Sequence, residues 1–396
     1  MTTEASFTSS AWPDPGGTLQ PRERSQVGEL IVQARSRQVT IGSPQATYRW
    51  DLSRLDRVVS FHAPDMILTV ETGLTLNAVK DIVEAEKLWL PLDMPGGGDR
   101  SLAEYLAGDD SLSWLSHRYG TVRDWIMGLT ALDDQGREVT SGARVVRNVS
   151  GYQLAPLYIG AGDTLGPIVE VSFRLQPLPV PATVVSWQAD NPDPLVAIWQ
   201  QSRRISHPSG RGEPWEAFRL EHLDGQWRLD GMTRFPPEDV AAWEGPSSGL
   251  RLARWATPRG AGSAGIVSKE AIIETRVPPR EGRRNALQSN IRIQVFATQV
   301  PELLASLHSL GVELTCYPAA GVIRVGRLDG IRERSALESL LAAVVDKGGR
   351  VQPMTADVPV KIPAPTSLSA DRVLMTRVKR VLDPDGVFGP LPVEQW

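Results

Sequence analysis

Cysteine is almost absent from this chain, and that absence limits its chemistry. Cys316 is the only cysteine among 396 residues. A lone cysteine excludes an internal disulfide, a cysteine-ligated zinc site and an iron–sulfur cluster held by this chain alone. Histidine is also scarce, and its five copies show no paired metal-ligand spacing: His62, His117, His207, His222 and His308. The sequence therefore predicts no metal site.

Lysine and long hydrophobic runs are scarce as well. Of the 42 basic residues, 36 are arginine and six are lysine, and the arginines are scattered rather than clustered. With a net charge of −4, the sequence gives no basis for attraction to nucleic acid. No stretch of eighteen apolar residues occurs, and the N-terminus lacks the basic and apolar regions of a signal peptide. We therefore expect a cytoplasmic protein with no membrane span and no nucleic-acid partner.

Glycine, in contrast, is concentrated between strand-like segments of residues 119–179. Gly120 and Gly128 flank one apolar run, and a cluster of Gly160, Gly162 and Gly166 precedes a strand-like run over residues 168–175. Only glycine readily admits positive φ and close backbone approach to a phosphate or a ring. An isolated glycine pattern is also typical of a turn that binds nothing. The pattern alone therefore leaves both interpretations open.

Three ordered segments of this region carry a family resemblance. They read YGTVRD from Tyr119, RNVSGYQ from Arg147 and GAGDTLGPIVE from Gly160. Together they resemble the FAD-binding domain of the vanillyl-alcohol-oxidase, or PCMH-type, flavoprotein superfamily, and within it the FAD-binding E subunits (GlcE) of bacterial glycolate oxidases. The likeness covers about residues 38–180 and, through the segment LDPDGVFGP, about residues 365–391. It is weaker between these two parts.

The resemblance implies an α+β fold with a particular division of the chain. We expect a PCMH-type FAD-binding domain of two α+β subdomains and a smaller cap domain with an antiparallel sheet. The expected divisions are a flexible polar leader at residues 1–24, the FAD-binding domain at residues 25–180, the cap at residues 181–350, and a C-terminal segment at residues 351–396 that returns to the first domain. The proline-rich connector at residues 177–181 marks the main boundary.

Apolar periodicity adds individual elements to this plan. In the first domain it predicts helices and strands at residues 27–34 (helix), 38–41 (strand), 58–61 and 66–71 (paired strands), and 74–86 (helix). In the cap it predicts helices at residues 194–203, 301–310 and 335–347, and strands at residues 226–229, 291–296 and 321–326. We expect the cap helices to lie on one side of its sheet.

The resemblance also implies non-covalent FAD and a set of residues that contact it. FAD is a large anion with an apolar ring system, so its site needs backbone N–H groups near the pyrophosphate and an apolar slot for the ring. The expected cofactor contacts come from the first glycine loop, the YGTVRD turn, the central segment and the third loop: Gly42, Ser43, Gly120, Thr121, Asp124, Asn148, Gly160, Gly162, Thr164, Leu165, Gly166 and Ile168. Asp124 could orient its own loop or form a hydrogen bond near the flavin, and a surface pair with Arg123 is an equal alternative.

Several positions depart from the family pattern. The first loop, residues 41–47, has a single glycine, and its Pro44 removes an N–H donor. The second loop, residues 99–110, has no glycine pair and carries Glu104, Asp109 and Asp110. In the third loop, Asp163 and Pro167 stand where glycine and valine are usual. Carboxylates beside a pyrophosphate are repulsive, so these departures bear on whether FAD is retained.

No catalytic residue can be assigned from the sequence. In glycolate oxidases, substrate oxidation is attributed to the sister D-type subunit, so a missing base is compatible with the resemblance. The sequence therefore predicts a FAD-binding oxidoreductase subunit that carries electrons in 2-hydroxy-acid (glycolate) oxidation. Its expected partners are a catalytic flavoprotein resembling the D subunit and a separate iron–sulfur subunit. The alternative is a PCMH-fold protein that has lost FAD and serves as a structural or assembly subunit.

Overall fold

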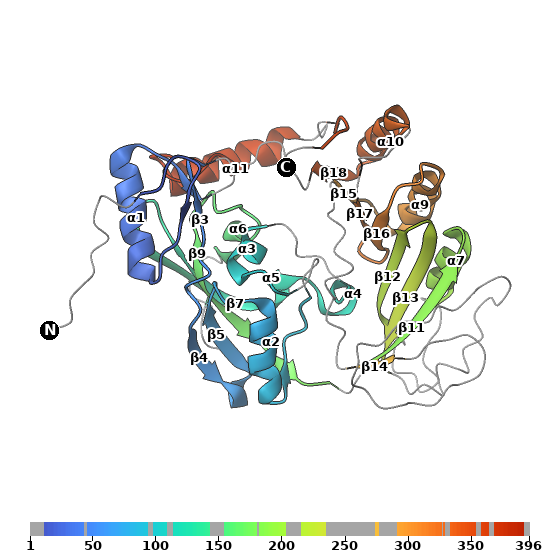
Figure 1. Cartoon of the computed structure of the whole chain (residues 1–396), viewed down its shortest axis with the longest axis horizontal. Helices are drawn as coiled ribbons and strands as arrows, with labels where there is room; N and C mark the ends of the chain where they lie inside the picture. The colour runs from blue at the N-terminus through green and yellow to red at the C-terminus, as the bar shows by residue number, and fades with distance from the viewer. Residues whose placement is uncertain are drawn as a thin grey trace.

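A computed structural model of the chain describes residues 12–42, 46–93, 98–108, 114–142, 154–179, 182–202, 215–234, 274–276, 291–326, 328, 333–353, 358–363 and 368–391. Within these residues the chain combines helices with several sheets, two of them large, so the expected α+β class is confirmed. Figure 1 shows the two large sheets side by side, each with its own helices. No helix in the described part of the chain is both long and apolar enough to cross a membrane.

A five-stranded antiparallel sheet forms the centre of the first half. Its strands run in the order β4 (Val58–His62), β5 (Ile67–Glu71), β9 (Ile168–Arg174), β7 (Ile126–Leu132) and β8 (Glu138–Gly142). The predicted pairing of residues 58–61 with residues 66–71 is confirmed by the β4–β5 ladder. The sheet and its helices share one buried apolar core.

Short helices close this core. They are α2 (Leu76–Ala85), α3 (Leu102–Ala107), α4 (Ser116–Tyr119), α5 (Val122–Trp125) and α6 (Ala155–Tyr158). In α2, Leu76, Val79 and Val83 are buried at helical spacing, and the N-cap Thr75 accepts a hydrogen bond from the amide of Ala78 at 3.1 Å. The helix expected over residues 74–86 is thereby confirmed. A two-stranded ribbon of β6 (Leu88–Trp89) and β10 (Gln176–Pro177) completes this half, with the 3₁₀ turn Ala63–Asp65 between β4 and β5.

A second, smaller unit packs beside the five-stranded sheet. Helix α1 (Arg24–Arg37) covers a sheet of β1 (Thr18–Leu19), β3 (Tyr48–Trp50) and β2 (Ile41–Gly42), whose neighbours are parallel. Part of the segment expected to be flexible is therefore folded. Leu19 is buried, and the Trp12 ring meets the Tyr48 ring edge-on with centroids 4.8 Å apart. These apolar side chains give the polar leader an anchor that its overall composition hides, while residues 1–11 lie outside the described part.

The second half is built on an eight-stranded antiparallel sheet. Its strands follow the order β14 (Glu274–Arg276), β11 (Ala182–Ala189), β13 (Gln226–Thr233), β12 (Trp215–Leu223), β16 (Leu314–Tyr317), β17 (Val322–Val325), β15 (Ile291–Gln294) and β18 (Arg350–Pro353). Three helices share a core with one face of this sheet: α7 (Asp193–Ser202), α9 (Val300–Ser309) and α10 (Arg334–Asp346). They lie on the side away from the five-stranded sheet (Figure 1), so the antiparallel sheet with helices on one side is confirmed. The 3₁₀ turn Ala297–Gln299 precedes α9.

The opposite face of the eight-stranded sheet packs against the first half. A separate apolar cluster joins Trp89, Trp114 and Leu115 to Met232 and Val322 of the sheet. The chain then returns through α11 (Leu368–Leu382), drawn along the top of Figure 1, towards the small N-terminal sheet.

Candidate functional site

The first glycine loop and the third glycine loop meet at Gly42. This residue ends β2 with φ of 118°, in the region that favours glycine. A Cβ placed there would lie 3.3 Å from Nε1 of Trp50 and 3.4 Å from the carbonyl oxygen of Asp163. The indole Nε1 of Trp50 is itself buried and makes no hydrogen bond. We call Gly42, Trp50 and residues 160–166 the glycine cluster.

Helix α3 holds the third loop in place. The amide of Gly160 donates to the carbonyl of Leu106 at 2.7 Å, and the amide of Gly162 donates to that of Ala107 at 2.8 Å. These bonds satisfy carbonyls at the C-terminal end of α3. The two amides therefore serve the protein itself, which differs from the expectation that they are donors for a phosphate. Gly162 still borders open space, since a Cβ there would meet nothing within 4 Å.

The rest of the third loop points into the core. The side chains of Leu165 and Ile168 are buried, and the hydroxyl of Thr164 donates to the carbonyl of Ala161 at 2.6 Å. A Cβ on Gly166 would lie 2.0 Å from the carbonyl oxygen of Leu132, so only glycine fits beside β7. At these positions any contact with a ligand would come from the backbone, and their role as cofactor contacts stays a prediction.

Asp163 is the exception within this loop. It adopts φ of 58°, uncommon for a residue with a side chain. Burial raises the pKa of its carboxyl to about 7. The residue nevertheless keeps part of its surface exposed to solvent.

The YGTVRD turn is organised by its own aspartate. The carboxylate of Asp124 accepts from the amide of Thr121 at 2.7 Å and from its hydroxyl at 3.1 Å, forming a capping box at the start of α5. Gly120 has φ of 78°, and a Cβ there would lie 2.4 Å from an Asp124 oxygen. Asp124 thus orients the loop, one of the roles named for it above. Arg123 donates to the carbonyls of Pro156 and Ile159, both at 2.6 Å, and so ties this turn to the entry of the third loop.

The C-terminal segment braces the glycine cluster from outside. Lys379 of α11 donates to the carbonyl of Thr164 at 2.6 Å and pairs with Asp383. Burial lowers the pKa of Lys379, although the hydrogen bond and charge of Asp383 oppose that shift. The backbone of β2 also bonds to this segment, because the amide of Ile41 donates to the carbonyl of Val387 at 2.9 Å.

A polar contact joins the two halves next to the YGTVRD turn. The Tyr119 hydroxyl donates to Glu216 of β12 at 2.9 Å, and Arg234 donates to the same carboxylate at 2.9 Å. Burial and the negative charge of Glu216 raise the pKa of Tyr119, so the hydroxyl keeps its proton. The rings of Trp89 and Trp114 stack with arginines of the eight-stranded sheet, Arg234 over Trp89 at 5.1 Å and Arg219 over Trp114 at 4.8 Å.

A row of polar side chains crosses the eight-stranded sheet on the face turned to the first half. Strand pairing places one member on each of six adjacent strands: Arg228, Glu221, Thr315, Arg324, Arg292 and Gln352. We call this set the polar row. It lies on the same face as Val322, which packs with Trp89 and Trp114. Arg228 donates to Glu221 at 3.1 Å, and Arg292 donates to Gln352 at 3.4 Å.

Within this row, Arg292 and Arg324 stand directly opposite each other on β15 and β17. Their residues are 4 % and 5 % exposed, which is rare for arginine. Like charges directly opposite on a sheet are destabilising, and the planar guanidinium matches a carboxylate. The arrangement suits an anionic group.

The described histidines do not form a reaction centre. His222 contacts the carbonyl of Val312 at 2.7 Å, and His308 accepts from the indole of Trp227 at 3.0 Å. Both lie on the helix-covered side of the eight-stranded sheet, where they satisfy buried groups. In the part of the chain that the structure describes, no cluster of His, Cys, Asp and Glu could hold a metal ion.

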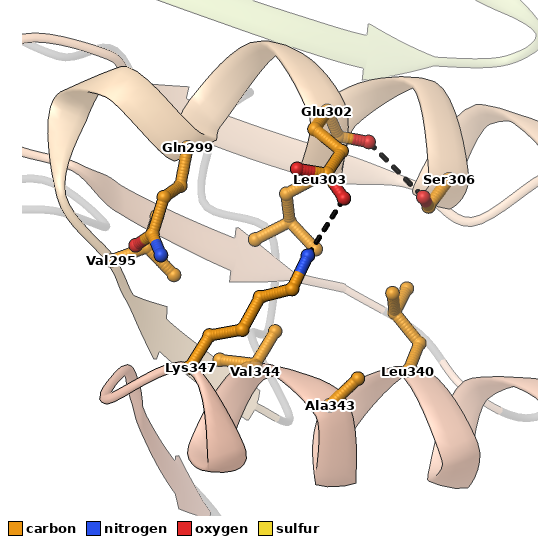
Figure 2. Close-up of a pocket in the computed structure, with 9 residues that line it drawn as sticks. All are labelled: Val295, Gln299, Glu302, Leu303, Ser306, Leu340, Ala343, Val344 and Lys347. Atoms are coloured by element: carbon orange, nitrogen blue, oxygen red, sulfur yellow. Dashed lines mark hydrogen bonds and ion pairs between the residues drawn. The ribbon is translucent and has the colours of Figure 1, made fainter.

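A hollow between α9 and α10 is a poor candidate for a substrate site. Figure 2 shows it lined by residues of both helices, with Lys347 reaching Glu302 across its mouth at 2.8 Å. Its cavity volume of about 40 Å³ holds little more than a water molecule. It also lies on the helix side of the sheet, away from the glycine cluster.

Two expected contacts, Ser43 and Asn148, lie outside the described residues. Conversely, the sequence analysis assigned no site role to Trp50, Lys379 or the arginines of the polar row. The spacing of Lys379 and Asp383, four residues apart before a turn, was a usable signal for a bracing pair. Trp50 offered no such signal, because nothing in the sequence shows that its indole is buried beside Gly42.

Comparison with known proteins agrees with this geometry. Residues 17–142 match the family model described as FAD binding domain. Over 295 residues the chain is 32% identical to D-2-hydroxyglutarate dehydrogenase of Xanthomonas citri pv. viticola, covering 70% of this chain and 60% of that protein. It is 26% identical over 155 residues to glycolate oxidase subunit GlcE of Escherichia coli (strain K12), covering 38% of this chain and 43% of the relative. The chain thus spans no more than 60% of the length of these curated relatives.

Solved structures share the fold at low sequence identity. An alkyldihydroxyacetonephosphate synthase aligns with a TM-score of 0.61 at 12% identity, covering 94% of this chain and 76% of that chain. A Bermuda grass isoallergen of pollen group 4 aligns with a TM-score of 0.64 at 13% identity, covering 96% and 91%. The expected PCMH-type architecture with its antiparallel cap sheet is confirmed, and residues 17–142 match the FAD binding domain family.

Proposed function

We propose that this chain is a FAD-binding oxidoreductase subunit that carries electrons in the oxidation of a 2-hydroxy acid. The observation that carries the proposal is the meeting of the first and third glycine loops at Gly42, braced by α3 and α11. The functional division would follow the expected boundaries, with FAD on residues 25–180, the cap over residues 181–350 and the return segment over residues 351–396.

The residues of the glycine cluster fit a dinucleotide with one exception. Gly162 leaves room for close approach of a ligand, and the buried indole N–H of Trp50 lacks an acceptor that a phosphate or hydroxyl would supply. Asp163 does not fit, because its carboxylate would oppose a pyrophosphate. When bound, FAD supplies a two-electron acceptor, and the chain's own residues hold and orient it.

The polar row supports an anionic substrate. Arg292 and Arg324 present guanidinium groups on the face that packs towards the FAD-binding half. Each guanidinium has five donors, so bonds within the protein leave capacity for a bound carboxylate. We infer that these two arginines orient the carboxylate of the 2-hydroxy acid. The partners would be a catalytic flavoprotein of the glycolate oxidase D type and an iron–sulfur subunit, because a chain with one buried cysteine cannot hold a cluster.

An absorption spectrum tests the proposal. The full chain is measured as purified, and again after incubation with excess FAD and gel filtration. Flavin bands at close to one equivalent, bleached anaerobically by glycolate, D-lactate or D-2-hydroxyglutarate alone or with the partner subunits, are the expected result. A folded, monodisperse and colourless chain in both measurements would overturn it.

A second candidate function is favoured by Asp163 and by the internal use of the Gly160 and Gly162 amides. Under this candidate the chain has lost FAD and acts as a structural or assembly subunit. A colourless chain that still co-purifies with its partner subunits would support this candidate. Retained flavin would exclude it.

A further inference from the structure

The outer face of α11 carries apolar side chains that the fold leaves uncovered. Val373, Leu374 and Val381 are 49 %, 59 % and 77 % exposed. They are three of the seven large hydrophobic side chains that are exposed in the described part of the chain. One exposed aliphatic side chain is normal on a protein surface, whereas a group of them on one helix marks an interaction site. The helix runs along the outside of the molecule in Figure 1.

Two arginines lie on the same side of α11. Because positions four apart share a helix face, Arg377 lies between Val373 and Val381, and Arg380 lies beside it. Both arginines are exposed, and neither forms an ion pair with another residue that the structure describes. We call this set the α11 face: Val373, Leu374, Arg377, Arg380 and Val381. It is both apolar and positively charged.

The inner side of the same helix is fixed to the protein. Val378 and Leu382 pack against the core of the five-stranded sheet. Lys379 donates to the carbonyl of Thr164 at 2.6 Å and to that of Phe388 at 3.1 Å. An α-helix with its side chains is about 10 Å across. The α11 face therefore lies about one helix diameter from the third glycine loop.

We propose that the α11 face binds the partner flavoprotein subunit, through a segment of that subunit that presents carboxylates around an apolar strip. The inference rests on the proposed function, which includes a partner that exchanges electrons with this chain. Free guanidinium groups complement carboxylates, and the aliphatic side chains beside them complement an apolar strip. A partner bound here would place its own cofactor on the side of the third glycine loop, where the proposed function places FAD.

The composition of the α11 face argues against two other occupants. Packing against the α11 face of a second copy about a two-fold axis would bring the arginines of the two copies together, and like charges in contact are costly. A helix that lies in a membrane interface has a continuous apolar face, often with Trp or Phe. The α11 face has neither aromatic residue, and Arg377 interrupts its aliphatic side chains. An acidic protein surface fits both the charge and the apolar area.

A binding measurement tests the proposal. The probe is the purified D-type catalytic flavoprotein of the same organism, and biolayer interferometry gives its Kd for the full chain. The variants are the double substitution Arg377→Glu with Arg380→Glu, and the single substitution Leu374→Asp. We expect Kd to rise about tenfold for the first and at least as much for the second, which puts a negative charge in the apolar area. The wild-type Kd should also rise with salt, and this dependence should weaken in the double variant.

Matched controls lie on the cap. Arg334→Glu reverses an exposed arginine at the start of α10, and Phe296→Asp replaces an exposed apolar side chain just before the 3₁₀ turn Ala297–Gln299. Both should keep the wild-type Kd. Circular dichroism should show that every variant is folded, since all the substituted side chains are exposed.

The remaining measurements distinguish the alternatives. Sedimentation of the chain alone, and with vesicles of equal parts phosphatidylcholine and phosphatidylglycerol, reports self-association and lipid binding. The inference is overturned if the wild type does not bind the flavoprotein, if the α11 variants bind it as the wild type does, or if these variants lose only self-association or vesicle binding. The absorption spectrum of each sample reports FAD independently. Retained flavin with unaltered partner binding would therefore reject the α11 face and leave the proposed function standing, whereas a colourless wild-type chain would reject the proposed function.

Discussion

Arg292 and Arg324 are the residues whose substitution most directly tests the proposed substrate. A charge-assisted hydrogen bond contributes about 1.5–3 kcal/mol, so Arg292→Gln or Arg324→Gln should raise the acid concentration for half-maximal flavin reduction by about tenfold or more. Stopped-flow reduction at varied 2-hydroxy-acid concentration measures this, and FAD binding should be unchanged. Arg350→Gln, an exposed position on the same sheet, serves as the control. If all three variants need the same acid concentration for half-maximal flavin reduction, Arg292 and Arg324 do not bind the substrate.

Asp124 gives a second prediction at this scale, on stability. Its carboxylate accepts both the amide and the hydroxyl of Thr121. Asp124→Ala should lower the free energy of unfolding by about 1–2 kcal/mol, because the capping box at the start of α5 is lost. Urea unfolding followed by circular dichroism measures the loss. Asp133→Ala, in the turn between β7 and β8, offers a comparison at another aspartate that accepts backbone amides. A change within 0.3 kcal/mol of wild type on Asp124→Ala would contradict the capping role.

Single residues also show where sequence reasoning ends. The motif order located Gly42, Gly120 and Gly160 correctly as turn glycines, since all three have positive φ. It did not show that the Gly160 amide is used by α3, because that bond joins segments more than fifty residues apart. Nor could it show that Trp50 lies beside Gly42. A local sequence pattern predicts which backbone conformations a turn needs. Which acceptors the backbone amides of that turn bind depends on contacts with distant segments.

Helix α11 braces the third loop through a buried ion pair. Lys379→Met leaves the buried carboxylate of Asp383 without its cation and should lower the free energy of unfolding by about 3 kcal/mol. Asp383→Asn alone should also destabilise, since this carboxylate accepts the amides of Val387 and Phe388. The double variant should lose at least 1 kcal/mol less than the sum of the two, as urea unfolding would show. Strict additivity would mean that the two groups do not stabilise each other.

Helix α1 is held to the five-stranded sheet by a pH-sensitive contact. Arg24 reaches Glu71 at 3.3 Å and Glu170 at 2.9 Å, two buried carboxylates paired across β5 and β9. Burial would raise the pKa of Glu71, but the hydrogen bonds and charge of Arg57, with the charge of Arg24, hold it below its ordinary value of 4.5. A lowered folded pKa contributes stability above pH 4.5 that is lost as pH falls further.

Arg24→Gln should therefore destabilise the protein most at pH 7, where Glu71 is charged, and progressively less towards pH 4. Urea midpoints at pH 4, 5 and 7 measure this dependence. Arg22→Gln, on an exposed residue just before α1, is the control and should show no such trend. A loss that is constant across the three pH values would argue against the ion pairs.

Elements with clear periodicity were predictable, and those without it were not. The helix at residues 301–310 corresponds to α9, and its buried positions recur at helical spacing. Strand β12 was missed because it is buried along almost its whole length and carries charged residues, Glu216, Arg219 and Glu221, on one buried face. An alternating apolar and polar pattern cannot reveal a strand whose polar face is also covered.

At the scale of the whole molecule, the sequence predicted an antiparallel cap with helices on one side but not what fills its other face. That face packs on the FAD-binding half through Trp89, Trp114 and the Glu216 contact. The charged groups on that face are buried only because side chains of both halves pair with them. The sequence of one segment alone therefore cannot predict that they are buried. The two large sheets are therefore coupled through a mixed apolar and ionic interface.

Glu216→Gln tests that coupling. The substitution keeps the shape of the side chain but removes the charge that Arg234 and Arg118 face, leaving mostly buried Arg234 without its carboxylate. Loss of one partner of a buried pair costs about 3 kcal/mol, which here falls on the contact between the halves. We expect differential scanning calorimetry to show the wild type melting in one transition, and Glu216→Gln in two or in one broadened transition at lower temperature. Glu313→Gln is the control, because Glu313 immediately precedes β16 and takes no part in the Glu216 contact. A single transition of Glu216→Gln at the wild-type temperature would contradict this ionic coupling. The apolar cluster of Trp89 and Trp114 would then be sufficient to hold the two halves together, because removing the charge of Glu216 would have left them coupled.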